Sequence, residues 1–178
     1  MKYTFRDFLT LSIPASVIIF FDQLTKLWVE RNLEVGEFWM PLTWLEPYAR
    51  LIHWKNTGVA FGMFQDSNLF FAALAWFVTA AIAFYFPRIS RQDWPLRLAL
   101  TLQFSGALGN MIDRLRVGYV IDFISVGKFY IFNIADSAIT IGVVVLVLGV
   151  FIQEMRERKE KKAAAQAEAQ SDHPVEEA

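Results

Sequence analysis

The sequence predicts an α-helical membrane protein, a four-transmembrane-helix bundle with a small strand-containing extracytoplasmic platform. Of its 178 residues, 55% are hydrophobic and 16% aromatic, which is more apolar than an ordinary soluble domain. Long apolar runs occur four times, and the basic residues lie in alternate connections between them. We therefore interpret residues 1–155 as one integral-membrane domain and residues 156–178 as a charged, partly disordered cytoplasmic tail.

The four expected spans lie at about 8–29, 69–86, 96–112 and 136–152. A bilayer core requires roughly 20 predominantly apolar residues, and these runs approach that length. Asp22 and Lys26 interrupt the first run, and no small-residue cleavage site follows it. We therefore expect the first run to be an uncleaved anchor rather than a signal peptide.

The basic residues predict the orientation of the spans. They gather before the first span, between the second and third, and after the fourth (Lys2, Arg6, Arg88, Arg91, Arg97, Arg156, Arg158, Lys159, Lys161 and Lys162). Because Lys and Arg concentrate in cytoplasmic connections, both termini are expected in the cytoplasm, with connections 30–68 and 113–135 facing outward. The alternating segment Tyr48–Trp54 and the Trp residues around it indicate strands resting on the outer bilayer surface.

Four aspartates lie inside the apolar runs or at their outward ends: Asp22, Asp113, Asp122 and Asp136. A carboxylate at membrane depth costs roughly 2.5–3.5 kcal/mol and by default marks a functional site. The chain has no cysteine and two histidines, which excludes thiolate chemistry and argues against a histidine-based metal site. We expect carboxylate chemistry that requires neither a metal nor a cofactor.

Asp122 and Asp136 are 14 residues apart, so they meet only if the chain between them turns back. Gly127 and Lys128 offer a turn, and Phe129–Phe132 can return toward the fourth span. Two adjacent carboxylates share a proton, so that one activates water while the other protonates a carbonyl oxygen. Alternatively, Asp136 caps the free N–H groups at the start of the fourth span, and the spacing leaves this open.

Other polar positions have two interpretations each. The turn Asn56–Gly62 places an amide and backbone N–H groups beside a peptide, or is an ordinary Asn-Gly type of turn. Gly106–Gly109 offers a small-residue surface for close helix packing. Asp113 forms an ion pair with Arg114 or satisfies loop backbone.

Asp22 and Lys26 lie four residues apart on the first span, so that their charges neutralise one another. We interpret them as a structural polar pair.

Five segments in this order resemble the lipoprotein signal peptidases of bacteria, also called signal peptidase II. They are Asp22–Lys26, Asn56–Gly62, Gly106–Arg114, Val120–Phe123 and Phe132–Ser137. The resemblance extends over about residues 8–152. It implies an aspartic endopeptidase of the cytoplasmic (inner) membrane, multi-pass, with its active site toward the extracytoplasmic face.

The resemblance also implies roles for single residues. Asp122 and Asp136 are the expected catalytic pair, and the residues expected to bind substrate or shape the site are Asn56, Asn110, Arg114, Asn133, Asp113 and Gly106. The implied substrate is a diacylglyceryl-modified prolipoprotein, cut just before the lipid-bearing cysteine. Membrane lipids and globomycin-type inhibitors are further expected partners, nucleic acid is not, and a monomer suffices because one chain carries the whole site.

Two other functions remain as alternatives at this stage. A small proton-coupled transporter would use the aspartates as a relay and would spread them through the bilayer depth. A non-catalytic membrane scaffold would use them for helix caps and ion pairs, and would tolerate Asp→Asn changes.

Overall fold

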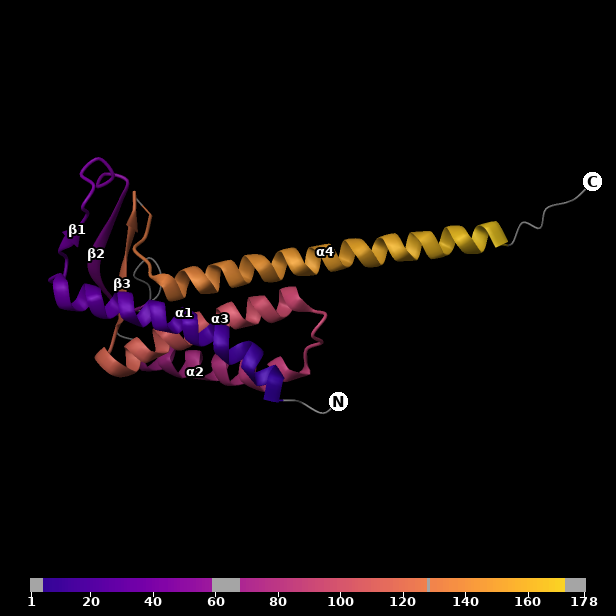
Figure 1. Cartoon of the computed structure of the whole chain (residues 1–178), viewed down its shortest axis with the longest axis horizontal. Coiled ribbons are helices and arrows are strands. Elements are labelled where there is room, and N and C mark those ends of the chain that lie inside the picture. Colours follow the sequence, from indigo (N-terminus) through magenta and orange to yellow (C-terminus); the bar gives the residue numbers. More distant parts are fainter. Residues whose placement is uncertain (1–4, 59–67, 128, 172–178) are drawn as a thin grey trace, which may run out of the picture.

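Four helices lie side by side, and a small antiparallel sheet stands at one end of them (Figure 1). The computed structural model describes residues 5–58, 68–127 and 129–171. In chain order the elements are α1 (Phe5–Asn32), β1 (Phe38–Trp39), β2 (Ala49–Asn56), α2 (Asn68–Tyr85), the short 3-10 helix η2 (Phe86–Arg88), α3 (Trp94–Val117), β3 (Val120–Val126) and α4 (Ile134–Ser171). The expected bundle with a strand-containing platform is confirmed.

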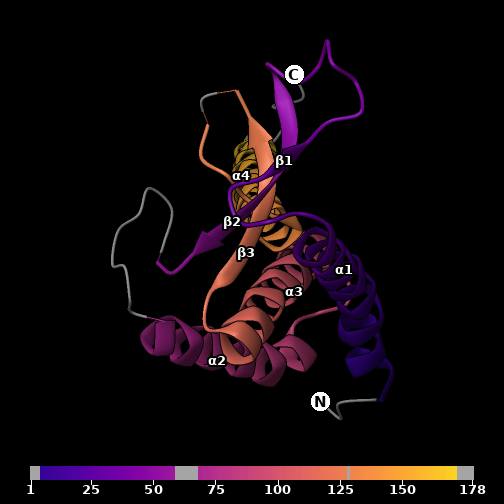
Figure 2. The same cartoon turned by 90° about the vertical axis from the view of Figure 1, so that its left-hand side faces the viewer.

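Three of the helices in the described part of the chain, α1, α2 and α4, are long and apolar enough to cross a membrane. The third expected span corresponds to α3, which is not among these three helices because its composition is more polar. Its buried residues include Arg97, Thr101, Ser105, Asn110 and Asp113. Because α3 contacts α1, α2 and α4 and lies between them in Figure 2, these polar groups face protein rather than lipid.

The small residues of α3 permit close contact with α4, as the Gly106–Gly109 pattern predicted. A Cβ atom added at Gly106 would lie against the carbonyl oxygen of Ala135 and 2.6 Å from Cγ1 of Ile139. A Cβ atom at Gly109 would lie 2.8 Å from a carboxylate oxygen of Asp22. Both glycines therefore bring the start of α4 and the middle of α1 against the same part of α3.

The sheet has the order β1-β2-β3, with both pairs antiparallel. Trp54 of β2 lies opposite Asp122 of β3. After β3 the chain turns at Gly127, which has a φ of +54°, and Phe132 then bridges back to Ile124. The return toward the fourth span that the sequence suggested is therefore present.

The platform exposes large aromatic side chains. Trp44, Tyr48 and Trp54 are 69%, 68% and 48% exposed. Trp and Tyr are favoured at membrane–water boundaries because each combines an apolar ring with a polar group. These exposed side chains are of the kind found at a membrane–water boundary.

At the opposite end of the bundle, a buried carboxylate that the sequence reasoning did not single out ties α1 to the α2–α3 connection. Asp7 accepts a hydrogen bond of 2.8 Å from Nε of Arg91, and Arg97 lies 3.8 Å away. Arg97 also donates to the hydroxyl of Thr10 at 2.6 Å. The connection between α2 and α3 is thus attached to the first turns of α1.

The fourth helix continues beyond residue 152 as far as Ser171. The charged segment that follows the span therefore begins as helix, as its Glu, Lys, Ala and Gln content favours. Residues 172–178 of the expected tail lie outside the described residues.

Candidate active site

The two aspartates of the expected pair lie where the sheet meets the start of α4. Asp122 is on β3 and is 1% exposed, and Asp136 is in the first turn of α4. The backbone beside Asp122 is held by side chains, because the N–H of Ile121 donates to Asp113 at 3.2 Å and its C=O accepts from Asn133 at 3.4 Å. These contacts fix the register of β3 against the helices.

Asn133 connects both aspartates and is fully buried. Its side-chain Nδ2 donates to Oδ1 of Asp122 at 2.7 Å, and its backbone N–H donates to Oδ2 of Asp136 at 3.3 Å. In return, the backbone N–H of Asp136 donates to Oδ1 of Asn133 at 2.9 Å. This reciprocal pair has the arrangement of a capping box at the N-terminus of α4. Asp136 therefore lies in the site and also caps the helix, so its two sequence interpretations are compatible.

Asn110 of α3 supports the pair from the side of the bundle. Its Nδ2 donates to Oδ1 of Asp136 at 2.8 Å, while its Oδ1 accepts from Nζ of Lys26 at 3.0 Å and from Asn133 at 3.1 Å. Because the oxygen faces two donors, the amide hydrogens are directed toward Asp136.

Asn56, at the end of β2, holds Asp122 from the sheet side. Its Nδ2 donates to Oδ2 of Asp122 at 2.9 Å, and its Oδ1 accepts from the N–H of Gly58 at 3.1 Å. Of the turn that the sequence singled out, Asn56–Gly58 is described, and residues 59–62 lie outside the described residues.

Beneath the pair, Lys26 is at the centre of a buried ion cluster. Its Nζ lies 2.9 Å from Asp22 and 2.8 Å from Asp113, and all three side chains are almost fully buried. Asp22 and Lys26 are therefore not an isolated pair. Asp113 pairs with Lys26 rather than with the adjacent Arg114, and it also satisfies backbone through Ile121, which was the other interpretation.

Asp22 extends this cluster to α4. Its Oδ1 accepts a hydrogen bond of 2.9 Å from the N–H of Ala135. Nε2 of Gln23 lies within hydrogen-bond distance of carboxylate oxygens of Asp22 and Asp113, at 3.1 and 3.0 Å. Sequence reasoning did not single out Gln23, although it lies inside the segment Asp22–Lys26.

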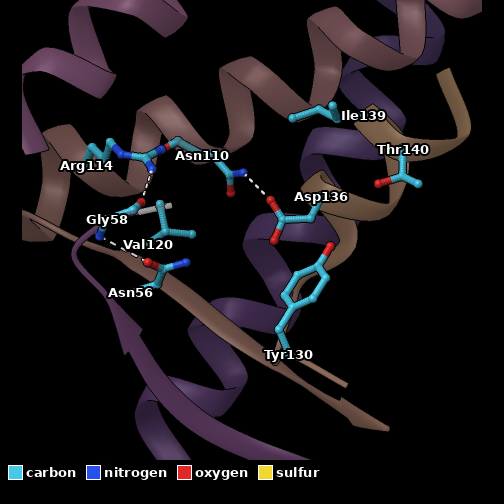
Figure 3. Close-up of a pocket in the computed structure, with 9 residues that line it drawn as sticks. All are labelled: Asn56, Gly58, Asn110, Arg114, Val120, Tyr130, Asp136, Ile139 and Thr140. Carbon is cyan, nitrogen blue, oxygen red and sulfur yellow. Dashed lines mark hydrogen bonds between the residues drawn. The ribbon is translucent and has the colours of Figure 1, made fainter. Parts of the chain in front are cut away.

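A cavity of about 200 Å³ opens beside Asp136, and Figure 3 shows the residues that line it. Its lining residues are Asn56, Gly58, Asn110, Arg114, Val120, Tyr130, Asp136, Ile139 and Thr140. Arg114 donates to the carbonyl oxygens of Gly58 and Asn110 at 3.3 and 3.4 Å. The cavity thus offers a carboxylate, amide groups and a guanidinium to a peptide.

Burial dominates the electrostatics of Asp122. It raises the pKa of this carboxyl to about 7, and the negative charge of Asp136 acts in the same direction. The hydrogen bonds from Asn56 and Asn133 and the positive charge of Lys26 oppose the shift. A carboxyl with a pKa near neutrality can exchange a proton with bound water at physiological pH.

Tyr130 is a further cavity residue that sequence reasoning missed. In Figure 3 its hydroxyl projects toward Asp136. Partial burial raises the pKa of Tyr130, and the charges of Asp136 and Asp122 add to this effect. Tyr130 lies between Phe129 and Phe132 in a segment whose spacing carries no catalytic signal, so only the fold identifies it.

The chain is similar to known proteins over most of its length. A family model described as "Signal peptidase (SPase) II" matches residues 14–152. A lipoprotein signal peptidase of Shouchella clausii is 40% identical over 148 residues, which are 83% of this chain and 96% of that protein. The lipoprotein signal peptidase of Halalkalibacterium halodurans is 38% identical over 155 residues, 85% of this chain and 97% of that protein.

A solved structure titled "Bacterial membrane enzyme structure by the in meso method at 2.3 A resolution" has a similar fold. Its TM-score is 0.74 at 29% identity, and the match covers 86% of this chain and 92% of that chain. A second structure with a similar title, at 1.9 Å resolution, has a TM-score of 0.70 at 30% identity and covers 84% of this chain and 95% of that chain.

Proposed function

The chain belongs to the signal peptidase II family, and from this premise we propose that Asp122 and Asp136 are its catalytic pair. The protein is an aspartic peptidase of the bacterial membrane that removes signal peptides from prolipoproteins. The observation that carries the proposal is the buried network in which Asn133 bonds to both carboxylates, of which Asp136 lines the cavity.

The proposed reaction uses one shared proton and no covalent intermediate. Asp122 is the member that we expect to hold the proton, because burial and the charge of Asp136 raise its pKa to about 7. Asp136 then takes a proton from water, the resulting hydroxide attacks the scissile carbonyl carbon, and Asp122 protonates the carbonyl oxygen. Collapse of the tetrahedral intermediate breaks the C–N bond, and a proton from the pair goes to the leaving amine.

The other polar groups of the cavity have supporting roles in this proposal. Asn56 and Asn110 hold the two carboxylates through hydrogen bonds of 2.9 and 2.8 Å. Arg114 presents positive charge near the expected position of the carbonyl oxygen, where a developing negative charge would be stabilised. Gly106 and Asp113 act indirectly, through the α3–α4 contact and through the register of β3.

We further propose that the substrate is cut just before a cysteine that carries diacylglycerol, and that the cavity faces the extracytoplasmic side. The sheet and the start of α4 are at one end of the bundle, while the start of α1 and the connection between α2 and α3 are at the other (Figure 1). Arg88 and Arg91 belong to that connection, and Arg97 lies in the first turn of α3. Basic connections favour the cytoplasm, which supports this orientation. A globomycin-type inhibitor would occupy the same cavity, and a monomer would suffice.

The transporter alternative predicted carboxylates at several depths along one path. Instead, Asp22, Asp113, Asp122 and Asp136 belong to one connected cluster at the sheet end of the bundle. A scaffold would also contain such a cluster, so the decisive experiment is catalytic.

That experiment measures cleavage of a purified diacylglyceryl-modified prolipoprotein by the wild type and by Asp122→Asn and Asp136→Asn. Asp93→Asn is the matched control, because Asp93 is at the N-terminus of α3 and its side chain makes no capping hydrogen bond. Each site variant should lose about 10²–10⁴-fold in rate, the usual contribution of a general acid or base. Near-normal cleavage by a folded Asp122→Asn or Asp136→Asn protein would refute the assignment.

A further inference from the structure

Tyr130 is carried to the cavity by the chain segment that returns from β3 to α4. The backbones of Ile124 and Phe132 exchange two hydrogen bonds, of 2.7 and 3.1 Å, which close this return. The ring of Tyr130 lies 4.4 Å from that of Phe129 and 5.9 Å from that of Phe132. Because the return is hydrogen-bonded and the rings pack together, the direction of the Tyr130 side chain is set by the fold.

The hydroxyl of Tyr130 is directed at the carboxylate that we propose as the base. Tyr130 and Asp136 both line the cavity of about 200 Å³. Figure 3 shows the Tyr130 hydroxyl pointing toward the Asp136 side chain. A phenol at this place offers an O–H donor to a group whose other neighbours in the site offer only N–H donors.

Asp136 has acceptor capacity left for such a donor. Its Oδ1 accepts from Nδ2 of Asn110 at 2.8 Å, and its Oδ2 accepts from the N–H of Asn133 at the longer distance of 3.3 Å. Asp122, by contrast, accepts two short hydrogen bonds, of 2.7 and 2.9 Å, from Asn133 and Asn56. Since each oxygen of a carboxylate can accept two hydrogen bonds, a further donor to Asp136 would complete its surroundings.

The surroundings of Tyr130 keep its phenol protonated. Partial burial raises the pKa of Tyr130, and the negative charges of Asp136 and Asp122 raise it further. An unperturbed phenol already ionises only near about pH 10, so Tyr130 carries its proton throughout the neutral range. A hydrogen bond from this proton to an ionised carboxylate is of the charge-assisted kind, which is stronger than one between neutral groups.

We propose that Tyr130 is a positioning residue for the reaction: when substrate is bound, its hydroxyl donates a hydrogen bond to Asp136 and keeps that carboxylate ionised and directed at the attacking water. The inference rests on the proposed function, in which Asp136 takes a proton from water. Tyr130 keeps its own proton throughout, and no bond to it forms or breaks. Hydrogen bonds of this kind often reach their working geometry only in the complex with substrate.

The first test removes the hydroxyl and keeps the ring. With a fluorogenic diacylglyceryl prolipopeptide, Tyr130→Phe should lower kcat about tenfold, the loss of one hydrogen bond to a charged group, while KM and Tm stay near their wild-type values. Tyr85→Phe is the matched control, because Tyr85 is 60% exposed at the end of α2, away from the sheet (Figure 1). It should have wild-type kinetics. A wild-type kcat for Tyr130→Phe would overturn the proposal.

The second test uses the pH profile, which packing alone would not change. The charged groups around Asp136 stay in place in Tyr130→Phe; they are Asp122 on β3, Arg114 on α3, and Lys26 and Asp22 on α1. A hydrogen bond to the ionised carboxylate favours the ionised form, so its loss should move the acidic limb of kcat/KM upward by about half to one pH unit. Tyr85→Phe should leave this limb in place. A lower Tm and kcat with an unmoved limb would show that Tyr130 serves packing only, which overturns the proposal.

A double variant tests whether Tyr130 acts through Asp136. If it does, the residual cleavage by Asp136→Asn should not fall further when Tyr130→Phe is added, because residues that act as a unit are not additive. A further tenfold decrease would overturn the proposal. Near-normal cleavage by folded Asp136→Asn would instead refute the proposed function, whereas an inactive Asp136→Asn together with a normal Tyr130→Phe would overturn only the role of Tyr130.

Discussion

Removing the charge of Lys26 tests whether the buried cluster beneath the pair is needed for stability, for catalysis or for both. Nζ of Lys26 contacts Asp22 at 2.9 Å, Asp113 at 2.8 Å and Asn110 at 3.0 Å. In Lys26→Met, a side chain of similar length replaces the ammonium group. Both carboxylates then lose their buried counter-ion, and the oxygen of Asn110 loses a donor.

The expected cost follows from burial. The side chains of Lys26, Asp22 and Asp113 are 0%, 1% and 0% exposed, so water cannot replace the missing charge. Breaking a buried ion pair by removing one partner costs about 3–5 kcal/mol. For a chain of this size, such a loss corresponds to a decrease in Tm of at least about 6 °C.

The double variant Lys26→Met/Asp113→Asn separates charge from packing. It removes one carboxylate together with the ammonium group, so the cluster regains its original net charge. The amide oxygen that replaces the carboxylate can still accept a hydrogen bond from the N–H of Ile121. The double variant should therefore recover part of the lost stability.

Cleavage by the double variant should nevertheless stay low. Without Lys26 the oxygen of Asn110 keeps only the donor Asn133, so its amide hydrogens are held less firmly toward Asp136.

The assay follows unfolding in detergent micelles by tryptophan fluorescence and measures kcat for each folded variant at a temperature below its transition. The reasoning would be refuted if Lys26→Met unfolded at the wild-type temperature. It would also be refuted if the double variant were less stable than Lys26→Met, because charge compensation would then not be the source of the stability.

Three further predictions concern the pair and the packing that brings it together. Because the folded protein raises the pKa of Asp122 to about 7, the shared proton is present below that pH and lost above it. A profile of kcat/KM measured from pH 5 to 9 should therefore fall above about pH 7. A flat profile would contradict this prediction. Asn133→Ala removes the side chain that contacts Asp122 and caps α4. Tm should therefore fall by several degrees and kcat by at least about tenfold. A variant with normal kcat would contradict the role of Asn133. Gly106→Ala places a methyl group against the Ala135 carbonyl and should lower Tm in micelles. Gly118→Ala is the comparison: it has open space around it, and its φ of +87° should cost only about 1 kcal/mol, the usual penalty for a left-handed residue. Equal Tm values for the two variants would argue against tight α3–α4 packing.

The sequence predicted several parts of the site because their signals are local. The sequence offered Asp136 as a cap at the start of the fourth span, and the structure shows that this cap is a reciprocal pair with Asn133. The ordered segments around Asn56, Asn110 and Asp122 indicated the family because residue types and order suffice for such a comparison. The third span was predicted at about residues 96–112, and the structure shows why it can be polar: α3 contacts the other three helices, so its side chains need not face lipid.

By itself, the sequence determined the apolar spans, the alternation of basic connections and the position of Asp22, Asp113, Asp122 and Asp136 within or beside those spans, because these properties depend only on which residues occur and in what order. Only the tertiary structure decided that Lys26 pairs with Asp113, that the N–H of Ala135 bonds to Asp22, and that Tyr130 lines the cavity beside Asp136. The first two contacts join residues on different helices, 113 positions apart in the second case, and side-chain direction in all three depends on how α1, α3 and α4 pack. Sequence spacing contains no information about such distances until the helices are placed against one another.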